Sequence, residues 1–261
     1  MYQELKHPDL VNPLGQVAIL LIDTVTPEGR TRPSFARGTI FNGGSNEYKI
    51  CGFTILQATE NNEKEWTDFE IETHESDSEH QLLLKLNEIL IEKLDTQPFI
   101  VSYNGMEFDL PLIDNRLAAN WLFGLQGFNR LKRRGQLDLI NLAPGVEGDK
   151  GKILGNGGTA VKPSLNFLAG TLNIPNDIWV SGASKTVYGS STYRRSQVEA
   201  ITTFVLLAMT LSAARYSSET VREAWKGLIA YLRQNEYHPD GRRNAHYGQF
   251  IGFVEREYSN S

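Results

Sequence analysis

The sequence predicts an α/β fold in which three antiparallel strands precede parallel strands, with helices packed on the sheet. Residues 16–22 form a continuous aliphatic run, which is typical of a strand buried on both faces. Residues 82–94 place leucine and isoleucine at helical spacing, with charged residues on the opposite face. A further short apolar run at residues 99–101 follows this helix, and the alternation of strands and helices indicates a mixed sheet.

Composition favours one large globular domain. The chain has 261 residues, of which 40% are hydrophobic and 22% are charged. The net charge of -5 excludes a uniformly basic nucleic-acid coat, although local basic patches can still bind phosphate. The single cysteine, Cys51, excludes an intrachain disulfide or a cysteine-based zinc cluster, and we expect it to pack in the core.

Targeting signals are not evident in the sequence. Residues 1–13 are polar and carry no apolar stretch of signal-peptide type, and no apolar run approaches the length that spans a bilayer. We therefore expect a cytoplasmic protein with no membrane contact.

The N-terminal half predicts the element order β-β-β-α-β-α. A strand over residues 16–22 ends at Asp23, and further strands follow at residues 48–56 and 66–71. Ser78 is a plausible N-cap for the helix over residues 78–94. Pro98 ends that segment before the strand at residues 99–101, and the next helix begins at Leu110 and continues through Arg116 and Trp121.

The C-terminal half is predicted to be mainly helical. The glycine-rich segment 145–161 indicates a loop and lacks the spacing of a phosphate-binding P-loop. Helices are predicted at residues 164–172, 198–214 and 218–233, the last capped by Ser217 or Ser218. Residues 242–261 give no clear element.

One segment carries a specific resemblance. Ser102-Tyr103-Asn104-Gly105-Met106-Glu107-Phe108-Asp109 follows a predicted strand and resembles the second motif of the DEDD superfamily of 3′–5′ exonucleases, in the group similar to the proofreading domain of family B DNA polymerases. Residues 137–142 and 163–175 resemble later segments of the same family. The resemblance implies a ribonuclease H-like fold with an N-terminal extension over 1–15, an exonuclease-like domain over 16–215, and a C-terminal helix and tail over 216–261.

The resemblance implies a two-metal site. Family members bind two divalent cations, usually Mg²⁺ or Mn²⁺, between four carboxylates, because hard cations require oxygen ligands. Asp23 and Asp109 match the first and second motifs, and Glu199 matches the third when residues 203–206 are aligned with the family's T-Y-L-L run. Asp23, Asp109 and Glu199 are therefore the candidate catalytic residues and metal ligands.

The first and third motifs depart from the family pattern. Val25 stands where the family has glutamate, and the alignment that selects Glu199 puts Arg195 at the family's tyrosine. Together these changes shift the local charge by two units, which disfavours tight binding of two cations. A second alignment, anchored on Tyr193, would place Gln197 at the acidic position instead.

A competing first motif occurs at residues 69–73, whose sequence F-E-I-E-T resembles the family's F-D-I-E-T. About thirty residues separate Glu72 from Asn104, which leaves room for one helix and one strand but not for three strands. We therefore expect residues 69–73 to lie on the third strand.

Candidate nucleic-acid contacts come from basic and aromatic residues: Asn104, Phe108, Lys132, Arg133, Arg134 and Arg195. These residues and the incomplete motifs favour a degenerate exonuclease-like protein that binds a single strand or a 3′ end, is weakly active or inactive, and needs no cofactor. An active exonuclease using Mg²⁺ or Mn²⁺ is the first alternative. The second is a protein-interaction subunit that binds its partner through the C-terminal extension.

Overall fold

The computed structural model describes residues 3–4, 10–25, 48–94, 98–103, 105, 108–133, 135–139, 153–154, 160–161, 165, 190–237, 241 and 243–258. Within these residues a six-stranded sheet has the order β1-β6-β5-β2-β3-β4. The strands are β1 (Gln3–Glu4), β2 (Gly15–Val25), β3 (Lys49–Glu60), β4 (Trp66–Glu75), β5 (Phe99–Ser102) and β6 (Gly135–Asp138).

The sheet is mixed, as the sequence predicts. Strands β2, β3 and β4 pair antiparallel, whereas β5 pairs parallel with β2 and β6 pairs parallel with β5. Residues 69–73 lie on β4, the third of the antiparallel strands, so the prediction for this segment is confirmed. Residues Gln3–Glu4 add β1 as a parallel edge strand beside β6.

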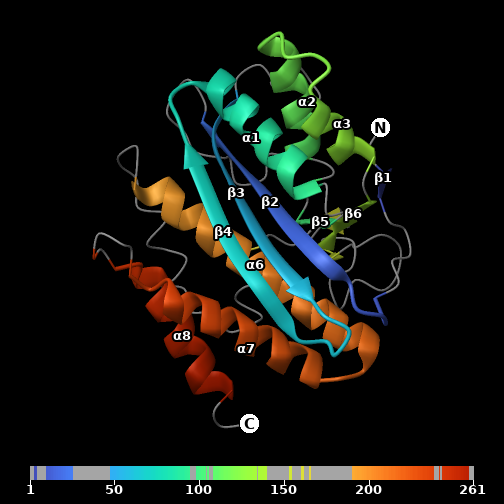
Figure 1. Cartoon of the computed structure of the whole chain (residues 1–261), viewed down its shortest axis with the longest axis vertical. Helices are drawn as coiled ribbons and strands as arrows, with labels where there is room; N and C mark the ends of the chain where they lie inside the picture. Colours follow the sequence, from blue (N-terminus) through green and yellow to red (C-terminus); the bar gives the residue numbers. More distant parts are fainter. Residues whose placement is uncertain are drawn as a thin grey trace.

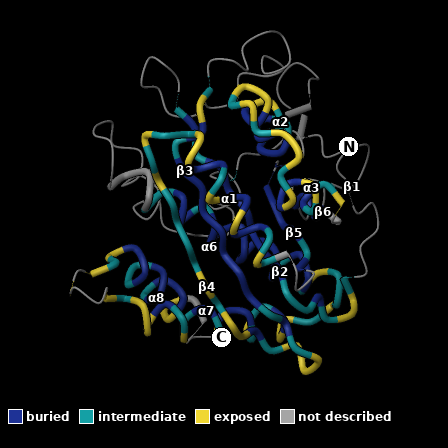
Figure 2. Tube along the Cα trace, turned by 45° about the horizontal axis from the view of Figure 1, so that its top comes forward, coloured by how far each residue is buried: buried dark blue, intermediate teal, exposed yellow. Residues whose placement is uncertain are grey.

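Helices cover both faces of the sheet (Figure 1). On one face lie α1 (Glu79–Leu94), α2 (Asp109–Ala119) and α3 (Gln126–Arg133). On the other face α6 (Ser190–Arg215) crosses β2, β3 and β4, while α7 (Glu219–Gln234) contacts β4 and α6, and α8 (Ala245–Tyr258) contacts α7. The tube view in Figure 2 shows the buried central strands enclosed between these layers.

The side chains of β2 alternate between two cores, because successive residues of a strand point to opposite faces. Val17, Ile19 and Leu21 belong to the core beneath α6, whereas Ala18, Leu20 and Ile22 belong to the core beneath α1. The alternation directs Asp23, the next odd-numbered residue, toward the α6 face. The continuous aliphatic run therefore has the two-sided burial that the sequence predicts.

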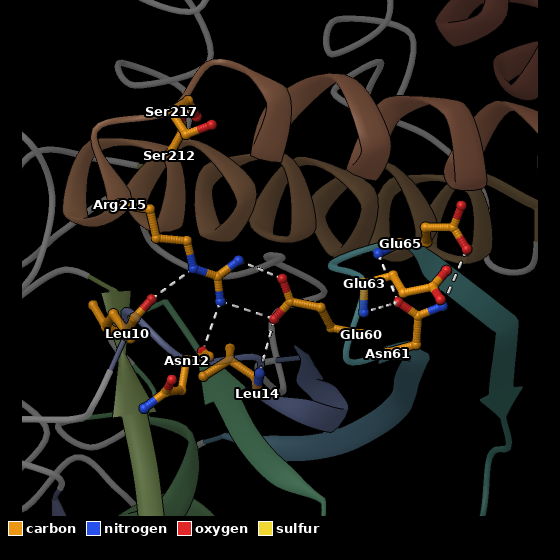
Figure 3. Close-up of polar contacts among 10 residues, drawn as sticks. All are labelled: Leu10, Asn12, Leu14, Glu60, Asn61, Glu63, Glu65, Ser212, Arg215 and Ser217. Carbon is orange, nitrogen blue, oxygen red and sulfur yellow. Dashed lines mark hydrogen bonds and ion pairs between the residues drawn. The ribbon is translucent and has the colours of Figure 1, made fainter.

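A buried ion pair lies at the end of the sheet where β2 begins, which we call the far end (Figure 3). Arg215, at the end of α6, donates from two nitrogens to the carboxylate of Glu60 on β3, and it also donates to the carbonyls of Leu10 and Asn12. Glu60 accepts a further hydrogen bond of 2.8 Å from the backbone N–H of Leu14. This network ties the segment before β2 to the C-terminal end of α6.

Helix α6 differs from the expectation that no apolar segment is long enough to span a bilayer. In the part of the chain that the structure describes, Arg194–Arg215 is the one segment long and apolar enough by length and composition, with a mean hydropathy of 1.5. However, 72% of that window is buried inside the protein, as in a core helix. Three of its threonines donate hydrogen bonds from their hydroxyls to backbone carbonyls one turn earlier. These polar side chains are therefore satisfied within an apolar helix.

Several element boundaries differ from the sequence prediction. Ser78 does cap α1 through a bond to the N–H of Gln81, but Ser218 precedes α7 without a side-chain cap. Helix α2 ends at Ala119, before Trp121, and residues 245–258 form α8 where the sequence indicated no element. Within segment 145–161, Ile153–Leu154 (β7) and Ala160–Val161 (β8) pair antiparallel, and the predicted helix at 164–172 lies outside the described residues apart from Leu165.

Candidate nuclease site

Asp23 lies on β2 where the pairing with β3 becomes irregular. Asp23 pairs with Gly52 and Thr24 pairs with Ile50, so Cys51 is an extra residue in β3. A Cβ on Gly52 would lie 3.0 Å from the carbonyl of His74 and 3.5 Å from the Cβ of Asp23. Glycine at position 52 therefore allows β4 and Asp23 to approach β3 closely on either side.

The environment of Asp23 is acidic. Burial is the main cause that raises the pKa of the Cys51 thiol to about 12, and the carboxylate of Asp23 is the next. Glu75 and Glu79 raise it further. The thiol stays protonated at neutral pH, which fits the packing role expected for Cys51, and its shift reports several carboxylates gathered at this end of β2 and β3.

Ser196 on α6 contacts Asp23. The Ser196 hydroxyl donates a short hydrogen bond to Oδ2 of Asp23, and Ser196 is fully buried. Sequence reasoning did not select Ser196. One signal could have identified it, because Ser196 lies one turn before Ala200 and two turns before Phe204 on the stripe of α6 that faces the core.

The neighbours of Ser196 on α6 point elsewhere. Arg195 donates from Nε to Oε1 of Glu199 at 2.9 Å, so these two predicted site residues pair with each other. Gln197, the acidic position in the second alignment, donates to Oγ1 of Thr73 at 3.3 Å, and its Oε1 lies 2.8 Å from Nε2 of His246. The prediction that Glu199 is a catalytic carboxylate remains a prediction.

The C-terminal helix supports this part of α6. His246 on α8 is buried against Gln197, and Arg194 donates to Oε1 of Gln249 at 2.6 Å. The residues of α6 that flank Ser196 are therefore held by a segment that the family resemblance does not cover. No pattern in the sequence predicts this contact.

Asp109 begins α2 and is buried, with 2% of its surface exposed. A helix N-terminus stabilises a carboxylate because its free N–H groups carry partial positive charge. A Cβ on Gly105 would lie 2.5 Å from the Cβ of Ser102 and 3.6 Å from Oδ2 of Asp109. The glycine of the second motif therefore lets the chain turn tightly between β5 and Asp109.

Strand β6 brings a further acid to the same edge. Asp138 ends β6, pairs in register with Ser102, and is 2% exposed. Burial is the main cause that raises the pKa of the Tyr103 phenol, and the charge of Asp138 adds to it. Since β2, β5 and β6 run parallel, Asp23, Asp109 and Asp138 all lie at the carboxyl ends of these strands.

An ion-pair network links α1 and α2 beside this edge. Glu79 accepts two hydrogen bonds from the guanidinium of Arg116, at 2.8 and 2.6 Å, and one each from Asn120 and the N–H of Ile50. Burial alone would raise the pKa of Glu79, but these hydrogen bonds outweigh it and hold the pKa below its ordinary value. The network fixes the C-terminal end of α2 against the start of α1.

The predicted nucleic-acid contacts have different surroundings. Phe108 is half-buried against Tyr48, and Nζ of Lys132 lies 2.6 Å from Oδ1 of Asp114. Arg133 is exposed at the end of α3, whereas Asn104 and Arg134 lie outside the described residues.

The described side chains do not fit a two-metal centre. No three His, Cys, Asp or Glu side chains among them are grouped so that they could hold a metal ion. One oxygen of Asp23 accepts the Ser196 hydroxyl, and Glu199 pairs with Arg195. We therefore derive no metal-dependent step from this geometry.

A mixed sheet of this order, with acids at the carboxyl ends of its parallel strands, defines a ribonuclease H-like, exonuclease-like protein. Residues 16–145 match the family described as DNA polymerase family B, exonuclease domain. The chain thus carries an exonuclease-like domain of the DEDD superfamily, as the second motif predicts. The match spans β2 to β6 and ends before α6, the helix on which the third motif is predicted.

Two solved structures resemble the chain at low identity. The family B DNA polymerase from the hyperthermophilic archaeon Pyrobaculum calidifontis is 13% identical, with a TM-score of 0.44 over 87% of this chain and 31% of the polymerase. Exonuclease I is 12% identical, with a TM-score of 0.39 over 85% of this chain and 44% of that one. The chain spans less than half the length of either protein. A comparison with curated protein sequences finds no significant match.

Proposed function

We propose that this protein is a nucleic-acid-binding exonuclease-like protein with an incomplete two-metal site, weakly active or inactive as a nuclease and used for binding or assembly. The observation that carries the proposal is the hydrogen bond from Ser196 to Asp23. A hydroxyl contributes no negative charge, and its proton occupies a lone pair of the carboxylate that would otherwise face a cation. Ser196 thus stabilises Asp23 without a metal.

The charge around Asp23 supports the same conclusion. Val25 lies on the same strand two residues further on, so it shares the α6 face of β2 with Asp23 and supplies no carboxylate there. The ion pair of Arg195 with Glu199 adds no net charge. Because one unit charge at 4 Å contributes about 4 kcal/mol at an effective dielectric of 20, the loss of each carboxylate weakens cation binding substantially.

The proposed ligand is a nucleic acid with a single strand or a 3′ end. The exposed Arg133 and the partly exposed Lys132 lie on α3, whose last turn carries only basic charges. Positive charge of this kind binds phosphates without reading sequence. The acids at the carboxyl ends of the parallel strands and the basic residues of α3 are compatible with a protein that binds a nucleic-acid strand and cleaves it slowly or not at all.

An active exonuclease is the second candidate, because Asp23 and Asp109 are both retained at the expected positions. The two candidates differ in a direct assay. The protein is incubated with 5′-labelled single-stranded DNA or RNA and Mn²⁺, alongside the variants Asp109→Ala and, as a control on an exposed strand position, Asp68→Asn. Shortening from the 3′ end that Asp109→Ala abolishes and Asp68→Asn preserves would overturn the proposal of an inactive protein.

A protein-interaction subunit is the third candidate, in which α7 and α8 bind a partner and nucleic acid is not a ligand. Salt separates this candidate from the first. Phosphate binding weakens steeply as salt concentration rises, because condensed counterions are released on binding. We expect the oligonucleotide affinity of the protein to fall between about 50 and 200 mM salt; no measurable binding at low salt would favour the interaction subunit.

A further inference from the structure

Two aromatic side chains project from the loop that follows α2. Trp121 is 83% exposed and Phe123 is 68% exposed, whereas Trp66 and Trp225 are buried. The rings of Trp121 and Phe123 lie 6.2 Å apart between centroids with an interplanar angle of 86°. Their edge-to-face arrangement, with both side chains mostly exposed, leaves aromatic surface open to solvent.

The backbone presents Trp121 outward at a position that favours glycine. The N–H of Trp121 donates to the carbonyl of Ala118, and the N–H of Leu122 donates to the carbonyl of Leu117, which is the hydrogen-bond pattern of a Schellman motif. Trp121 has a φ of 56°, in the left-handed region that a side chain disfavours. Neither local backbone preference nor core packing explains a tryptophan here.

The loop lies at the same end of the molecule as Asp23. Asn120, the residue before Trp121, donates to Oε2 of Glu79, and Oε1 of Glu79 accepts the N–H of Ile50. Ile50 precedes Cys51, whose pKa is raised by the charges of both Asp23 and Glu79. Figure 1 shows the end of α2 beside the start of α1 at this end of the sheet.

The chain around the aromatic pair is basic. Between Asp114 and Asp138 the sequence contains no acidic residue, although the whole protein has a net charge of -5. The basic residues in this interval are Arg116, Arg130, Lys132, Arg133 and Arg134. Arg116 pairs with Glu79 and Lys132 with Asp114, whereas Arg133 is exposed at the end of α3. Exposed aromatic rings followed closely in the sequence by such charge match the chemistry of a strand that carries unpaired bases on a polyanionic backbone.

We propose that Trp121 and Phe123 form a stacking platform for unpaired bases of a single-stranded nucleic acid. This platform rests on the proposed nucleic-acid-binding function. It supplies contacts with bases, which the incomplete acid cluster does not provide. The rings hold bases beside the end of α2, and the exposed Arg133 at the end of α3 contacts a phosphate further along the strand. The platform favours single strands over duplexes because paired bases are already stacked.

The test uses fluorescence anisotropy with a labelled oligothymidylate at low salt, and compares Trp121→Gly, Phe123→Ser and Tyr216→Gly. Tyr216 is the matched control, because it is 98% exposed, has a φ of 51° and ends α6 with the same two hydrogen bonds, from Tyr216 to Ala213 and from Ser217 to Ser212. It follows Arg215, which pairs with Glu60 at the far end of the sheet. Both glycine substitutions relieve the same backbone strain.

We expect Trp121→Gly to weaken binding about tenfold, Phe123→Ser to weaken it severalfold, and Tyr216→Gly to leave it unchanged. If the unaltered protein binds the oligonucleotide and Trp121→Gly binds it equally well, the platform is refuted while the proposed function stands. If the unaltered protein does not bind, both are refuted. Loss of binding to anionic lipid vesicles in Trp121→Gly, with oligonucleotide binding unchanged, would assign the pair to a membrane surface instead.

Discussion

Ser196 on α6 donates a hydrogen bond to Asp23 on β2, and the two residues are 173 positions apart in the chain. The contact joins the first motif of an exonuclease-like domain to a helix outside the region that matches the family. It gives the Asp23 carboxylate a hydroxyl partner within the protein.

Ser196→Asp should create a cation-dependent protein. Two carboxylates in contact repel each other, so the variant is expected to be less stable than the unaltered protein in chelator. Saturating Mn²⁺ should then raise the Tm of the variant by about 5–10 °C, because binding at a hundredfold excess over Kd contributes about 2.7 kcal/mol. Differential scanning fluorimetry with and without Mn²⁺ measures this shift.

The control for that experiment is Ser196→Ala, which removes the hydroxyl without adding charge. It should lower the free energy of unfolding by about 1.5–3 kcal/mol, because the charged acceptor Asp23 loses the hydrogen bond from Ser196. Its Tm should not respond to Mn²⁺. A Tm that rises with Mn²⁺ in Ser196→Ala or in the unaltered protein would mean that Asp23 already binds a cation.

The Glu60–Arg215 ion pair should be costly to break from either side. Both side chains are buried, so Glu60→Ala or Arg215→Ala leaves an unpaired charge and should destabilise the protein by about 3–5 kcal/mol. The double variant Glu60→Ala with Arg215→Ala should lose less than the sum of the two single changes, because neither charge remains. Urea unfolding gives the three free energies, and additive losses would contradict the coupling.

Acid should weaken the link between α1 and α2 through Glu79. The pKa of Glu79 is held below the ordinary value of 4.5, so the stabilisation is present above that value and is lost as the pH falls through the lower pKa of the folded state. Glu79→Gln should be less stable at pH 7 by about 1–3 kcal/mol and should show a shallower loss toward pH 3. Urea midpoints at both pH values check the slope.

Glu88→Gln provides the comparison for Glu79→Gln. Glu88 lies on the same helix, is exposed, and contacts only Lys85 among the described ion pairs, at 3.6 Å. Its substitution should change the free energy of unfolding by less than about 0.5 kcal/mol at pH 7. If both substitutions changed the free energy of unfolding equally, the contacts of Glu79 with Arg116 and Asn120 would not explain the loss of stability.

Substitution of Gly227 tests how closely α7 packs on β4, the edge strand of the sheet. A Cβ at position 227 would lie 2.2 Å from the carbonyl of Trp66, whereas a Cβ at Gly252 in α8 meets only Arg256, at 3.8 Å. Gly252→Ala should therefore stabilise the protein by about 0.5–1 kcal/mol through helix propensity, and Gly227→Ala should destabilise it despite the same gain. Thermal unfolding of the two variants gives opposite signs if α7 contacts β4 this closely.

Much of the fold was predictable because it depends on local patterns. The aliphatic run at residues 16–22 specifies a strand buried on both faces, and the spacing of leucines in residues 82–94 specifies an amphipathic helix. The segment from Ser102 to Asp109 identified the family because a glycine and an acid must follow β5 closely there. Residues 69–73 were assigned to the third strand by counting the residues available for the fold.

The site itself was only partly predictable from the sequence. Two alignments of the third motif selected Glu199 or Gln197, while Ser196, one position before Gln197 on the helix, makes a contact with Asp23. Trp121 is exposed, against what a general preference for packed tryptophans suggests, whereas Trp66 is buried. Side chains one position apart on a helix differ in direction by about 100°, so a shift of one residue changes the partner completely.

The sequence by itself determined the order β-β-β-α-β-α in the N-terminal half, the identity of the second motif and the lack of a carboxylate at Val25. These follow from periodicity and from residue type, which act over a few neighbouring positions. Only the tertiary structure decided which face of α6 meets β2, how α8 supports that face through His246, and where Trp121 points. Those relationships depend on how elements more than a hundred residues apart rotate and pack against one another, and packing is a property of the whole chain.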